Sequence, residues 1–261
     1  MELNLQDKVA VVTGASKGIG LAVTRALHAE GVTVVAGARS AGPDLPALEA
    51  TGRVVFVAVD LSGPAGPIAL VEAARTLGGV DILVNNAGAV TTRPDGFASV
   101  SDEDWENSIA LTLMAAVRTT RAAVPEMIRR GGGSIVTISS VNAYLPDPLV
   151  IDYSAAKAAL TNFCKALSKE LGPVGIRVNT ISPGPVETGL WLGGDGVAQT
   201  VAHATGVDPA AVAAQAAAVA VTGRFTRPTE IADLTLVLAS DRIGNVTGSD
   251  FAIDGGLVQT L

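Results

Sequence analysis

The amino-acid sequence predicts an α/β protein in which helices cover both faces of one doubly wound parallel sheet. Short apolar runs typical of strands alternate with helical patterns along all 261 residues, and such alternation indicates a parallel sheet. Hydrophobic residues make up 48% of the chain but aromatic residues only 3%, so the core must be mainly aliphatic, which suits strands buried on both faces. No linker or repeat interrupts the pattern, so we expect a single domain over residues 1–261.

Composition and charge argue against several classes of function. The formal net charge of −7 disfavours general nucleic-acid binding, and no apolar run reaches the length of a membrane span. The first residues lack the basic flank and cleavage site of a signal peptide, so we expect a cytoplasmic protein. Cys164, the single cysteine, is expected to be a core thiol, and His28 and His203 have no neighbours that resemble ligands. We therefore expect no metal site.

A glycine-rich turn separates the first strand from the first helix. Lys8–Thr13 is typical of a buried strand, and it is followed by Gly14, Gly18 and Gly20 and by an amphipathic helix to about Glu30. Glycines let the backbone approach a pyrophosphate, and the helix N-terminus offers free N–H groups and a positive dipole end. The first gap is one residue longer than in the usual dinucleotide fingerprint. The turn predicts a phosphate site, with a plain tight connection as the alternative.

The end of the second strand, Thr33–Ala38, bears on the choice of coenzyme. An acidic residue here would bind an adenosine ribose and favour NAD. Arg39 stands there instead, and its planar fork of donors suits a 2′-phosphate. Lys17 in the glycine turn adds a second positive charge, and Ser16 adds a hydroxyl. These residues predict NADP(H), unless Arg39 is only a solvated loop residue.

The third and fourth strands are expected at Arg53–Asp60 and Asp81–Val84, with a helix near Pro67–Leu77 between them. Asp60 could accept a hydrogen bond from an adenine amino group, or it could cap the next turn. The fourth strand runs into Asn85–Gly88. Small polar residues at the carboxyl end of a strand line the crevice where open parallel sheets bind ligands.

A long helix and the fifth strand are expected next. Ser101 and Asp104 have the spacing of a capping box, which predicts a helix from about Ser101 to Ile128. The fifth strand, Ser134–Ser140, ends in two serines, and Ser140 lies 13 residues before Tyr153. The intervening loop could bring both hydroxyls to one substrate oxygen; the alternative for Ser140 is a turn former.

Tyr153 and Lys157 open an apolar helical pattern that continues to Leu171. A spacing of four places both side chains on one helix face. A free tyrosine has a pKa near 10 and exchanges protons poorly at neutral pH. A neighbouring ammonium would favour the phenolate and lower that pKa, so that the pair could protonate a carbonyl oxygen or deprotonate an alcohol. The alternative is two ordinary helix residues.

The remaining chain contains a long insertion between two strands. The sixth strand is expected at Arg177–Ser182 and the last at Asp250–Ile253, with a helix at Pro228–Ser240 before the latter. Residues 189–220 hold a flexible joint at 193–196, and Asp208 is a good N-cap for an alanine-rich helix. An insertion at the carboxyl edge of the sheet predicts a substrate lid.

Taken together, these residues resemble the short-chain dehydrogenase/reductase family in its single-domain branch. The resemblance covers about Asp7 to Leu257, and its motifs are specific as an ordered set: Thr13-Gly14-x-x-x-Gly18-x-Gly20, Asp60, Asn85-Asn86-Ala87-Gly88, Ser140, Tyr153-x-x-x-Lys157, Pro183-Gly184 and Asp254-Gly255-Gly256. It implies a seven-stranded parallel Rossmann sheet with helices on both faces and a nicotinamide coenzyme. Similar proteins are often homotetramers.

The resemblance also implies a role for each site residue. Tyr153 would be the general acid/base, Ser140 would hydrogen-bond the substrate oxygen, and Lys157 would lower the tyrosine pKa and hold the nicotinamide ribose. The glycine turn would bind the pyrophosphate. The full set of expected coenzyme-binding residues is Gly14, Ser16, Lys17, Gly18, Ile19, Gly20, Arg39, Asp60, Leu61, Asn86, Ala87, Gly88, Tyr153, Lys157, Pro183, Gly184, Val186 and Thr188.

The sequence departs from the family pattern at one catalytic position. The family usually has an asparagine seven residues after a tryptophan, where it supports a chain of water molecules leading to the lysine. Here Thr112 stands seven residues after Trp105, and Asn107 should face elsewhere on the helix. Thr112 therefore becomes the fourth candidate catalytic residue, and its effect on proton relay is an open question.

The expected function is an NADP(H)-dependent oxidoreductase that interconverts a ketone or aldehyde and an alcohol. The partner would be a small, largely apolar carbonyl or alcohol substrate, and the protein a homo-oligomer. Two alternatives stand beside it: an NAD-dependent alcohol or sugar dehydrogenase, and a dinucleotide-binding regulator with little turnover. Intact Ser140, Tyr153 and Lys157 weigh against the regulator.

Overall fold

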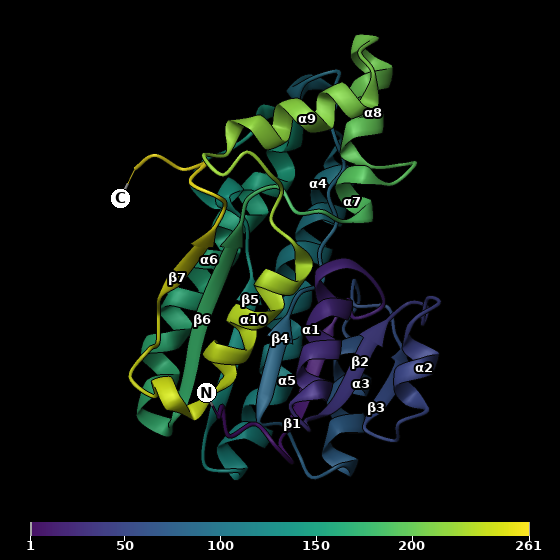
Figure 1. The fold of residues 1–261 in the computed structure, drawn as a ribbon. Helices are drawn as coiled ribbons and strands as arrows, with labels where there is room; N and C mark the ends of the chain where they lie inside the picture. The colour runs from purple at the N-terminus through teal and green to yellow at the C-terminus, as the bar shows by residue number, and fades with distance from the viewer. Residues whose placement is uncertain (1, 261) are drawn as a thin grey trace.

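One sheet of seven parallel strands forms the centre of the computed structural model, which describes residues 2–260. The strand order is β3-β2-β1-β4-β5-β6-β7, and every pairing is parallel (Figure 1). The predicted seven-stranded, doubly wound sheet is therefore confirmed. The strands are β1 Val9–Thr13, β2 Thr33–Ala38, β3 Val54–Ala58, β4 Ile82–Asn85, β5 Gly133–Ile138, β6 Ile176–Pro183 and β7 Asp250–Ile253.

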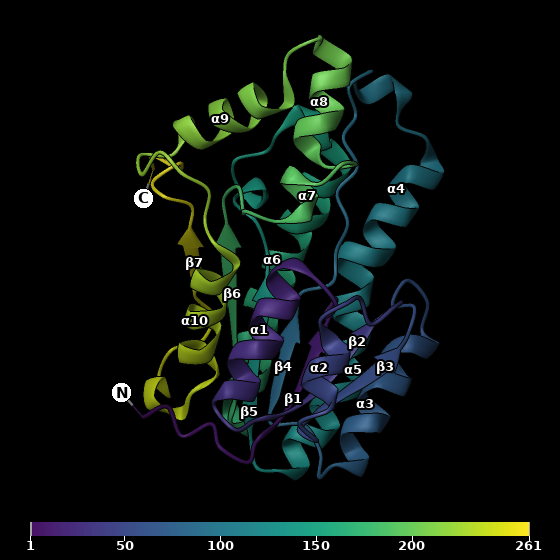
Figure 2. The same ribbon diagram turned by 45° about the vertical axis from the view of Figure 1, so that its right-hand side comes forward.

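Helices pack on both faces of the sheet. Helices α1 and α10 contact each other on one face, while α3, α5 and α6 cover the other, as the two views in Figures 1 and 2 show. The order of the sheet reverses between β1 and β4, and ligands of such sheets bind at this switch point. The bounds are α1 Gly18–Ala29, α2 Leu45–Glu49, α3 Ala65–Thr76, α4 Asp102–Ile109, α5 Ala115–Arg129, α6 Ile151–Leu171 and α10 Pro228–Ala239.

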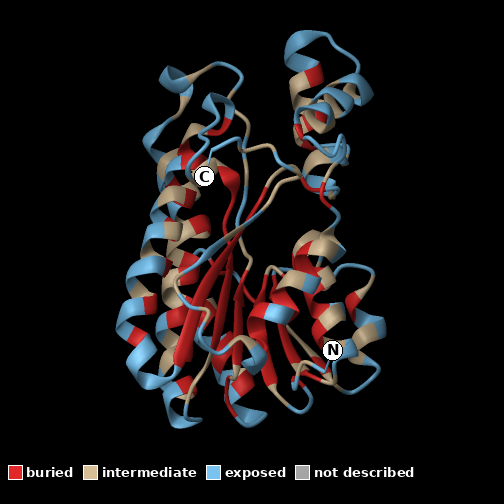
Figure 3. Ribbon diagram, turned by 60° about the vertical axis from the view of Figure 1, so that its left-hand side comes forward, coloured by how far each residue is buried: buried red, intermediate tan, exposed pale blue. Residues whose placement is uncertain are grey.

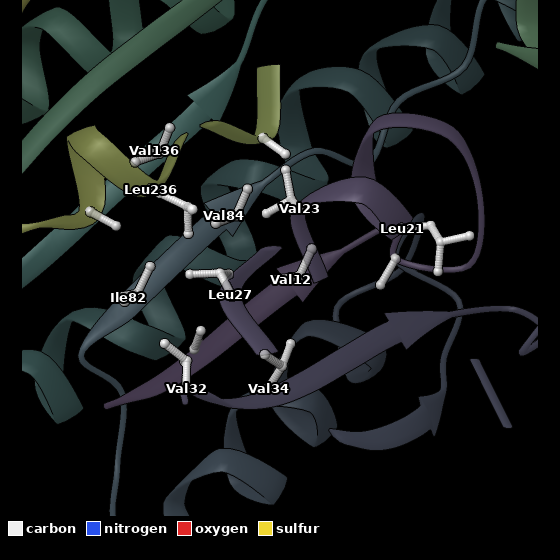
Figure 4. Close-up of a cluster of buried hydrophobic side chains, with 14 of the residues drawn as sticks. Val12, Leu21, Val23, Leu27, Val32, Val34, Ile82, Val84, Val136 and Leu236 are labelled. Carbon is white, nitrogen blue, oxygen red and sulfur yellow. The ribbon is translucent and has the colours of Figure 1, made fainter. Parts of the chain in front are cut away.

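Burial of both faces follows from the aliphatic composition. Val11 and Val12 are neighbours in β1, so their side chains point to opposite faces, and both are fully buried. Val12 packs with Leu27 of α1 and Leu236 of α10 (Figure 4), whereas Val11 packs in the cluster beneath α3 and α5. The buried residues in Figure 3 accordingly concentrate on the strands and the helix faces that cover them. The result is a rigid platform whose carboxyl edge carries the polar residues.

The prediction of a single α-helix from Ser101 to Ile128 is wrong for the middle of this segment. The capping box of Ser101 and Asp104 is present and starts α4, but Ala110–Met114 form a π-helical turn between α4 and α5. A π-turn closes its hydrogen bonds one residue later than an α-turn and changes which side chains face inward. It places Thr112 fully inside the protein, whereas Asn107 is exposed.

Several element ends differ from the predicted bounds. Strand β3 ends at Ala58, so Asp60 lies in the following turn and not at the strand end, while β6 extends from Ile176 to Pro183. Helix α6 begins at Ile151, which puts Tyr153 in its first turn. The predicted bounds of β2 and β7 are confirmed.

The insertion contains more helix than expected. It consists of α7 Gly189–Leu192, α8 Val197–Thr205 and α9 Pro209–Val219, which lie beyond the carboxyl ends of the strands (Figure 2). The predicted N-cap of α9 is confirmed, because Asp208 accepts hydrogen bonds from the N–H groups of Ala210 and Ala211. The residues at 193–196 join α7 to α8.

Within residues 2–260, no helix combines the length and apolarity that a membrane crossing requires. The same part of the chain holds no group of three or more His, Cys, Asp or Glu side chains placed to bind a metal ion. Cys164 is buried and free, which confirms its expected place in the core.

Candidate active site

The glycine turn adopts a backbone that only glycine accommodates easily. Gly14 has a φ of +66°, in the left-handed region. A Cβ on Gly20 would lie 2.2 Å from the carbonyl oxygen of Gly14 and 2.5 Å from Asn86 Nδ2, so this position cannot carry a side chain. The close approach brings the first turn of α1 against the end of β1. Lys17 is the N-cap residue and gives that turn no side-chain cap among the described residues, so its N–H groups can meet an anion.

Thr13 and Asn86 tie the glycine turn to the end of β4. The Thr13 hydroxyl accepts from the N–H groups of Asn86 at 2.9 Å and Ala87 at 3.0 Å. The Asn86 amide donates back to the carbonyls of Thr13 at 2.9 Å and Gly14 at 3.1 Å. The Asn86 side chain thus holds the glycine turn in shape, because its amide group is used by the carbonyls of Thr13 and Gly14. Sequence analysis identified Asn86 but not this function.

Two cations stand near the carboxyl ends of neighbouring strands, Lys17 in the glycine turn after β1 and Arg39 after β2. Arg39 and Lys17 are both exposed, and neither forms an ion pair within residues 2–260. Asp60 accepts from the backbone N–H of Ser62 at 2.9 Å, so it caps this turn, and its expected role in binding adenine stays a prediction. The Ser62 N–H is the main reason that the pKa of Asp60 is lowered; the Ser62 hydroxyl and Arg39 add to the effect. Arg39 and Asp60 are therefore neighbours.

Several expected coenzyme residues have side chains that are buried in the core or packed against it. Leu61 and Val186 are buried in the core, and Ile19 and Ala87 pack against it. On the opposite side of the glycine turn, a Cβ on Gly18 would lie 3.3 Å from the methyl group of Thr188, which places Thr188 directly against the turn. Pro183 ends β6, and Gly184 packs closely on Asp254. These positions suit recognition through the backbone.

Ser140 is held in a short hydrogen-bonded turn after β5. Its hydroxyl accepts from the N–H of Asn142 at 3.1 Å and lies 3.2 Å from Asn142 Oδ1, to which it can donate. The Ser140 hydroxyl also opposes the rise in the pKa of the Tyr153 phenol by hydrogen bonding, so the two side chains are neighbours. The loop between β5 and α6 therefore returns the chain as predicted and brings Ser140 and Tyr153 together.

Tyr153 and Lys157 lie one turn apart on α6. Lys157 is 3% exposed, its Nζ donates to the carbonyl of Ile138 at 2.6 Å, and it lies 5.5 Å from the centre of the Tyr153 ring. The amine is thus anchored to the end of β5, beside Ser140.

The predicted lowering of the Tyr153 pKa is wrong. Removal of the phenol from water raises its pKa to about 12, and only the Ser140 hydroxyl opposes that rise. Burial also lowers the pKa of Lys157 to about 8, because a desolvated ammonium loses its proton more easily. The sequence identified the pair but could not give the desolvation that dominates both groups. In this arrangement, Tyr153 keeps its proton at neutral pH.

Thr112 lies beside this pair, as its place in the pattern predicted. A Cβ on Gly88 would lie 3.8 Å from Lys157 Nζ and 4.0 Å from Thr112 Oγ1, so both groups converge on the end of β4. The Thr112 hydroxyl is fully buried and has no hydrogen-bond partner among the described residues. Buried polar groups are normally satisfied by protein or water, so this hydroxyl can serve a water molecule near the lysine.

A comparison with protein families now identifies the chain. The model of the short chain dehydrogenase family matches residues 8–192. The chain belongs to the short-chain dehydrogenase/reductase family. The match includes the glycine turn, Asn86, Ser140, Tyr153 and Lys157, and it ends at the last residue of α7.

Individual relatives of this short-chain dehydrogenase/reductase cover 97–100% of its length. It is 34% identical to the 3-oxoacyl-(acyl-carrier-protein) reductase FabG of Thermotoga maritima, over 98% of this chain and 100% of the relative. It is 36% identical to 3beta-hydroxysteroid dehydrogenase 1 of Eggerthella lenta, over 97% and 95%. Among solved structures, L-sorbose reductase from Gluconobacter frateurii, complexed with NADPH and L-sorbose, matches with a TM-score of 0.91 and 37% identity over 100% of both chains.

Sequence reasoning missed two residues that shape the site of this short-chain dehydrogenase/reductase, and it named a third, Thr13, without its function. Thr13 stood in the glycine motif, but its hydroxyl's link to the end of β4 was not foreseen. Asn142 holds Ser140, and its place next to a recognised motif is a signal that could have found it. Arg93 forms an ion pair with Asp152, the residue before Tyr153. The two lie 59 positions apart, and no sequence spacing links them.

Proposed function

We propose that the protein is an NADP(H)-dependent oxidoreductase that interconverts a ketone or aldehyde and the corresponding alcohol. The observation that carries this proposal is the meeting of Ser140, Tyr153 and Lys157 at the carboxyl end of β5. Each contributes a group that a carbonyl reduction needs: a hydroxyl donor, a proton donor and a buried ammonium.

The chain's own residues account for the proton. Tyr153, with a pKa of about 12, stays protonated at neutral pH and can donate to a carbonyl oxygen. Ser140 orients that oxygen, and the Lys157 ammonium stabilises the charge left on the phenol oxygen after transfer. The nicotinamide, when bound, supplies or accepts the hydride. The high phenol pKa favours carbonyl reduction over alcohol oxidation near neutral pH.

The crevice fits a dinucleotide with a 2′-phosphate. The glycine turn admits a pyrophosphate where a Cβ would clash, and the first turn of α1 offers N–H groups. Arg39 and Lys17 are exposed cations near the carboxyl ends of β2 and β1, and their charge supports the binding of a 2′-phosphate. The complex of L-sorbose reductase with NADPH supports the same coenzyme here. NAD(H) lacks the 2′-phosphate and would gain less from the two cations.

The substrate is proposed only as a class. The named substrates of the relatives are a sugar, a 3-oxoacyl group and a steroid, and they share a carbonyl or secondary alcohol and little else. The segment 189–220 is proposed as a lid over this substrate. A single domain, a homo-oligomer such as a tetramer and a cytoplasmic location belong to the same proposal.

The test is a panel of ketones and alcohols assayed with NADPH, NADH, NADP and NAD by nicotinamide absorbance. Charge-assisted hydrogen bonds of about 1.5–3 kcal/mol predict a kcat/KM for NADPH about 10- to 100-fold above that for NADH. The double variant Ala38→Asp, Arg39→Ser should reverse the order. Arg53→Ser, at a half-buried arginine just before the amino end of β3, is the matched control and should leave the order unchanged. Equal kcat/KM values in the parent would contradict the coenzyme assignment.

The regulator alternative predicts a different result from the same panel. It requires tight NADPH binding without turnover of any carbonyl, and Thr112 in place of asparagine is the observation that favours it. Turnover by the parent that Tyr153→Phe abolishes would rule this alternative out.

A further inference from the structure

Arg93, in the segment between β4 and α4, joins three parts of the site. Its Nη1 donates to Asp104 Oδ1 at 2.8 Å and its Nη2 to Asp152 Oδ2 at 2.8 Å, with Nε 3.5 Å from Asp152 Oδ1. Its backbone N–H donates to the carbonyl of Leu149 at 2.7 Å. Arg93 therefore connects the loop after β4 to the start of α4 and to the first turn of α6 through its side chain, and to the preceding turn through its backbone.

The start of α6 depends on this connection because it lacks an ordinary helix cap. Val150 is the N-cap residue, and no side chain of the described chain caps the first turn from that position. Asp152 supplies the negative charge of that turn and is 2% exposed. A carboxylate buried so deeply is costly unless a cation pairs with it. Arg93, 12% exposed, is that cation.

The orientation of Tyr153 follows from that of Asp152. Consecutive residues of an α-helix point about 100° apart, so a fixed Asp152 side chain sets the rotation of the first turn and with it the direction of the phenol. The planar guanidinium reaches both carboxylates at once, which a lysine ammonium cannot do with the same geometry. Asp104 is itself fixed by Ser101, whose N–H and hydroxyl donate to it.

We propose that Arg93 is a positioning residue: by bridging Asp104 and Asp152, it fixes the first turn of α6 so that the Tyr153 hydroxyl points to the substrate oxygen. The catalytic part of this inference rests on the proposed function, whereas the structural part does not. The proposal predicts that loss of Arg93 impairs proton donation much more than coenzyme binding.

The variants are Arg93→Met, Arg93→Lys and the apolar pair Arg93→Met, Asp152→Leu. The matched control is Arg130→Met, because Arg130 also forms a two-point ion pair with a carboxylate, Asp81, at 2.5 and 3.0 Å. That pair lies at the amino end of β4, away from the site. All variants are compared in the full-length protein by thermal unfolding, steady-state kinetics and hydrogen exchange.

We expect Arg93→Met to lower kcat about 10- to 100-fold, since misplacement by about 1 Å costs this much, with the KM for NADPH changed less than about threefold. The deuterium isotope effect with C4-deuterated NADPH should change, which a loss of folded protein alone would not cause. The kcat of Arg93→Lys should fall less than that of Arg93→Met. The apolar pair should regain thermal stability but not kcat, and Arg130→Met should lose stability with kcat retained.

Hydrogen exchange tests the inference without any turnover. Amides of residues 150–157 should exchange faster in Arg93→Met than in the parent, while those of 158–171 should not, and Arg130→Met should leave both unchanged. If the parent reduces no carbonyl, the proposed function fails, and the exchange rates still decide the positioning. Unchanged exchange at 150–157, or a kcat of Arg93→Met that falls only with its folded fraction, would overturn the inference.

Discussion

The sheet and the insertion at 189–220 differ in how many of their residues are buried. Every residue of β1 and of β6 is buried, whereas α9 contains none within Pro209–Val219 and α8 contains only Ala198 and Ala202. Val219 and Val221 are 60% and 83% exposed at the end of the insertion. Ser140 follows β5, and Tyr153 and Lys157 lie on α6, which packs against the sheet; we count them with the first region, and the expected substrate cover with the second.

This difference separates what must be fixed from what can adapt. Groups that handle a proton need positions held to a fraction of an ångström, and a core buried on both faces supplies them. A segment with few buried contacts opens at little free-energy cost, so it can change shape around a substrate without disturbing the sheet. Substitutions in the first region should therefore alter kcat, and those in the second should alter substrate binding.

The largest expected effect lies in the fixed region. Tyr153→Phe keeps the ring and removes the proton, so kcat should fall at least about 100-fold, as for loss of a general acid, with NADPH binding little changed. Steady-state kinetics and coenzyme titration measure both quantities. A variant that kept most of its activity would contradict the assignment of proton transfer to the fixed region, because the chemistry would then lie elsewhere.

The second effect concerns pH and the buried amine. The pKa of Lys157 is lowered to about 8, so the ammonium is present below that pH and is lost above it. With Tyr153 protonated up to about pH 12, the rate of carbonyl reduction should be level near pH 7 and about tenfold lower one unit above pH 8. A kcat profile measured with NADPH, with folding checked at each pH, tests this. A profile level to pH 10 would show that the charge of Lys157 is not needed.

The third effect concerns the insertion. If it closes on the substrate, protease cleavage within 189–220 should slow several-fold when coenzyme and substrate are both bound. Cleavage near the chain ends provides the internal control. Unchanged rates at the insertion would mean that the segment is fixed packing, and the contrast between the two regions would lose its functional meaning.

The smallest effect concerns Thr112. Asparagine offers an acceptor oxygen and two donor protons where threonine has one hydroxyl, so Thr112→Asn should hold a water near Lys157 better. We expect kcat to rise about 2- to 10-fold, less than about 1.4 kcal/mol of barrier, and only if proton transfer limits the rate.

The solvent deuterium isotope effect tests whether Thr112 takes part in proton transfer. Thr112→Val is the matched control, since it keeps the shape of the side chain and removes the hydroxyl. A large solvent isotope effect in the parent that neither substitution alters would exclude Thr112 from the relay.

Sequence patterns predicted those parts of the molecule that depend on local chemistry. The glycine turn, the capping box at Ser101 and the N-cap at Asp208 were found because a few neighbouring residues determine each of them. The strand arrangement followed from the alternation of apolar segments. The π-turn at 110–114 was missed, because a single extra residue in a helical turn leaves the apolar periodicity on either side intact.

The properties of the site that depend on distant residues could not be predicted. The raised pKa of Tyr153 comes from desolvation, which exists only once the chain has folded around the phenol. The bridge from Arg93 to Asp152 joins separate segments with no shared motif. Asp60 had two open roles, and only the position of the Ser62 N–H showed that it caps the turn.

The buried Lys157 also sets how folding stability responds to alkali. In the unfolded chain this amine holds its proton to about pH 10.4, but in the folded protein it releases it near pH 8. The unfolded state therefore binds more protons above pH 8, so this residue makes the native state more stable as pH rises. Burial raises the pKa of Cys164 to about 11. Above the free value near 8.5, this thiol therefore makes the native state less stable as pH rises. A narrow interval just above pH 8 should thus combine a rising melting temperature with a falling reduction rate.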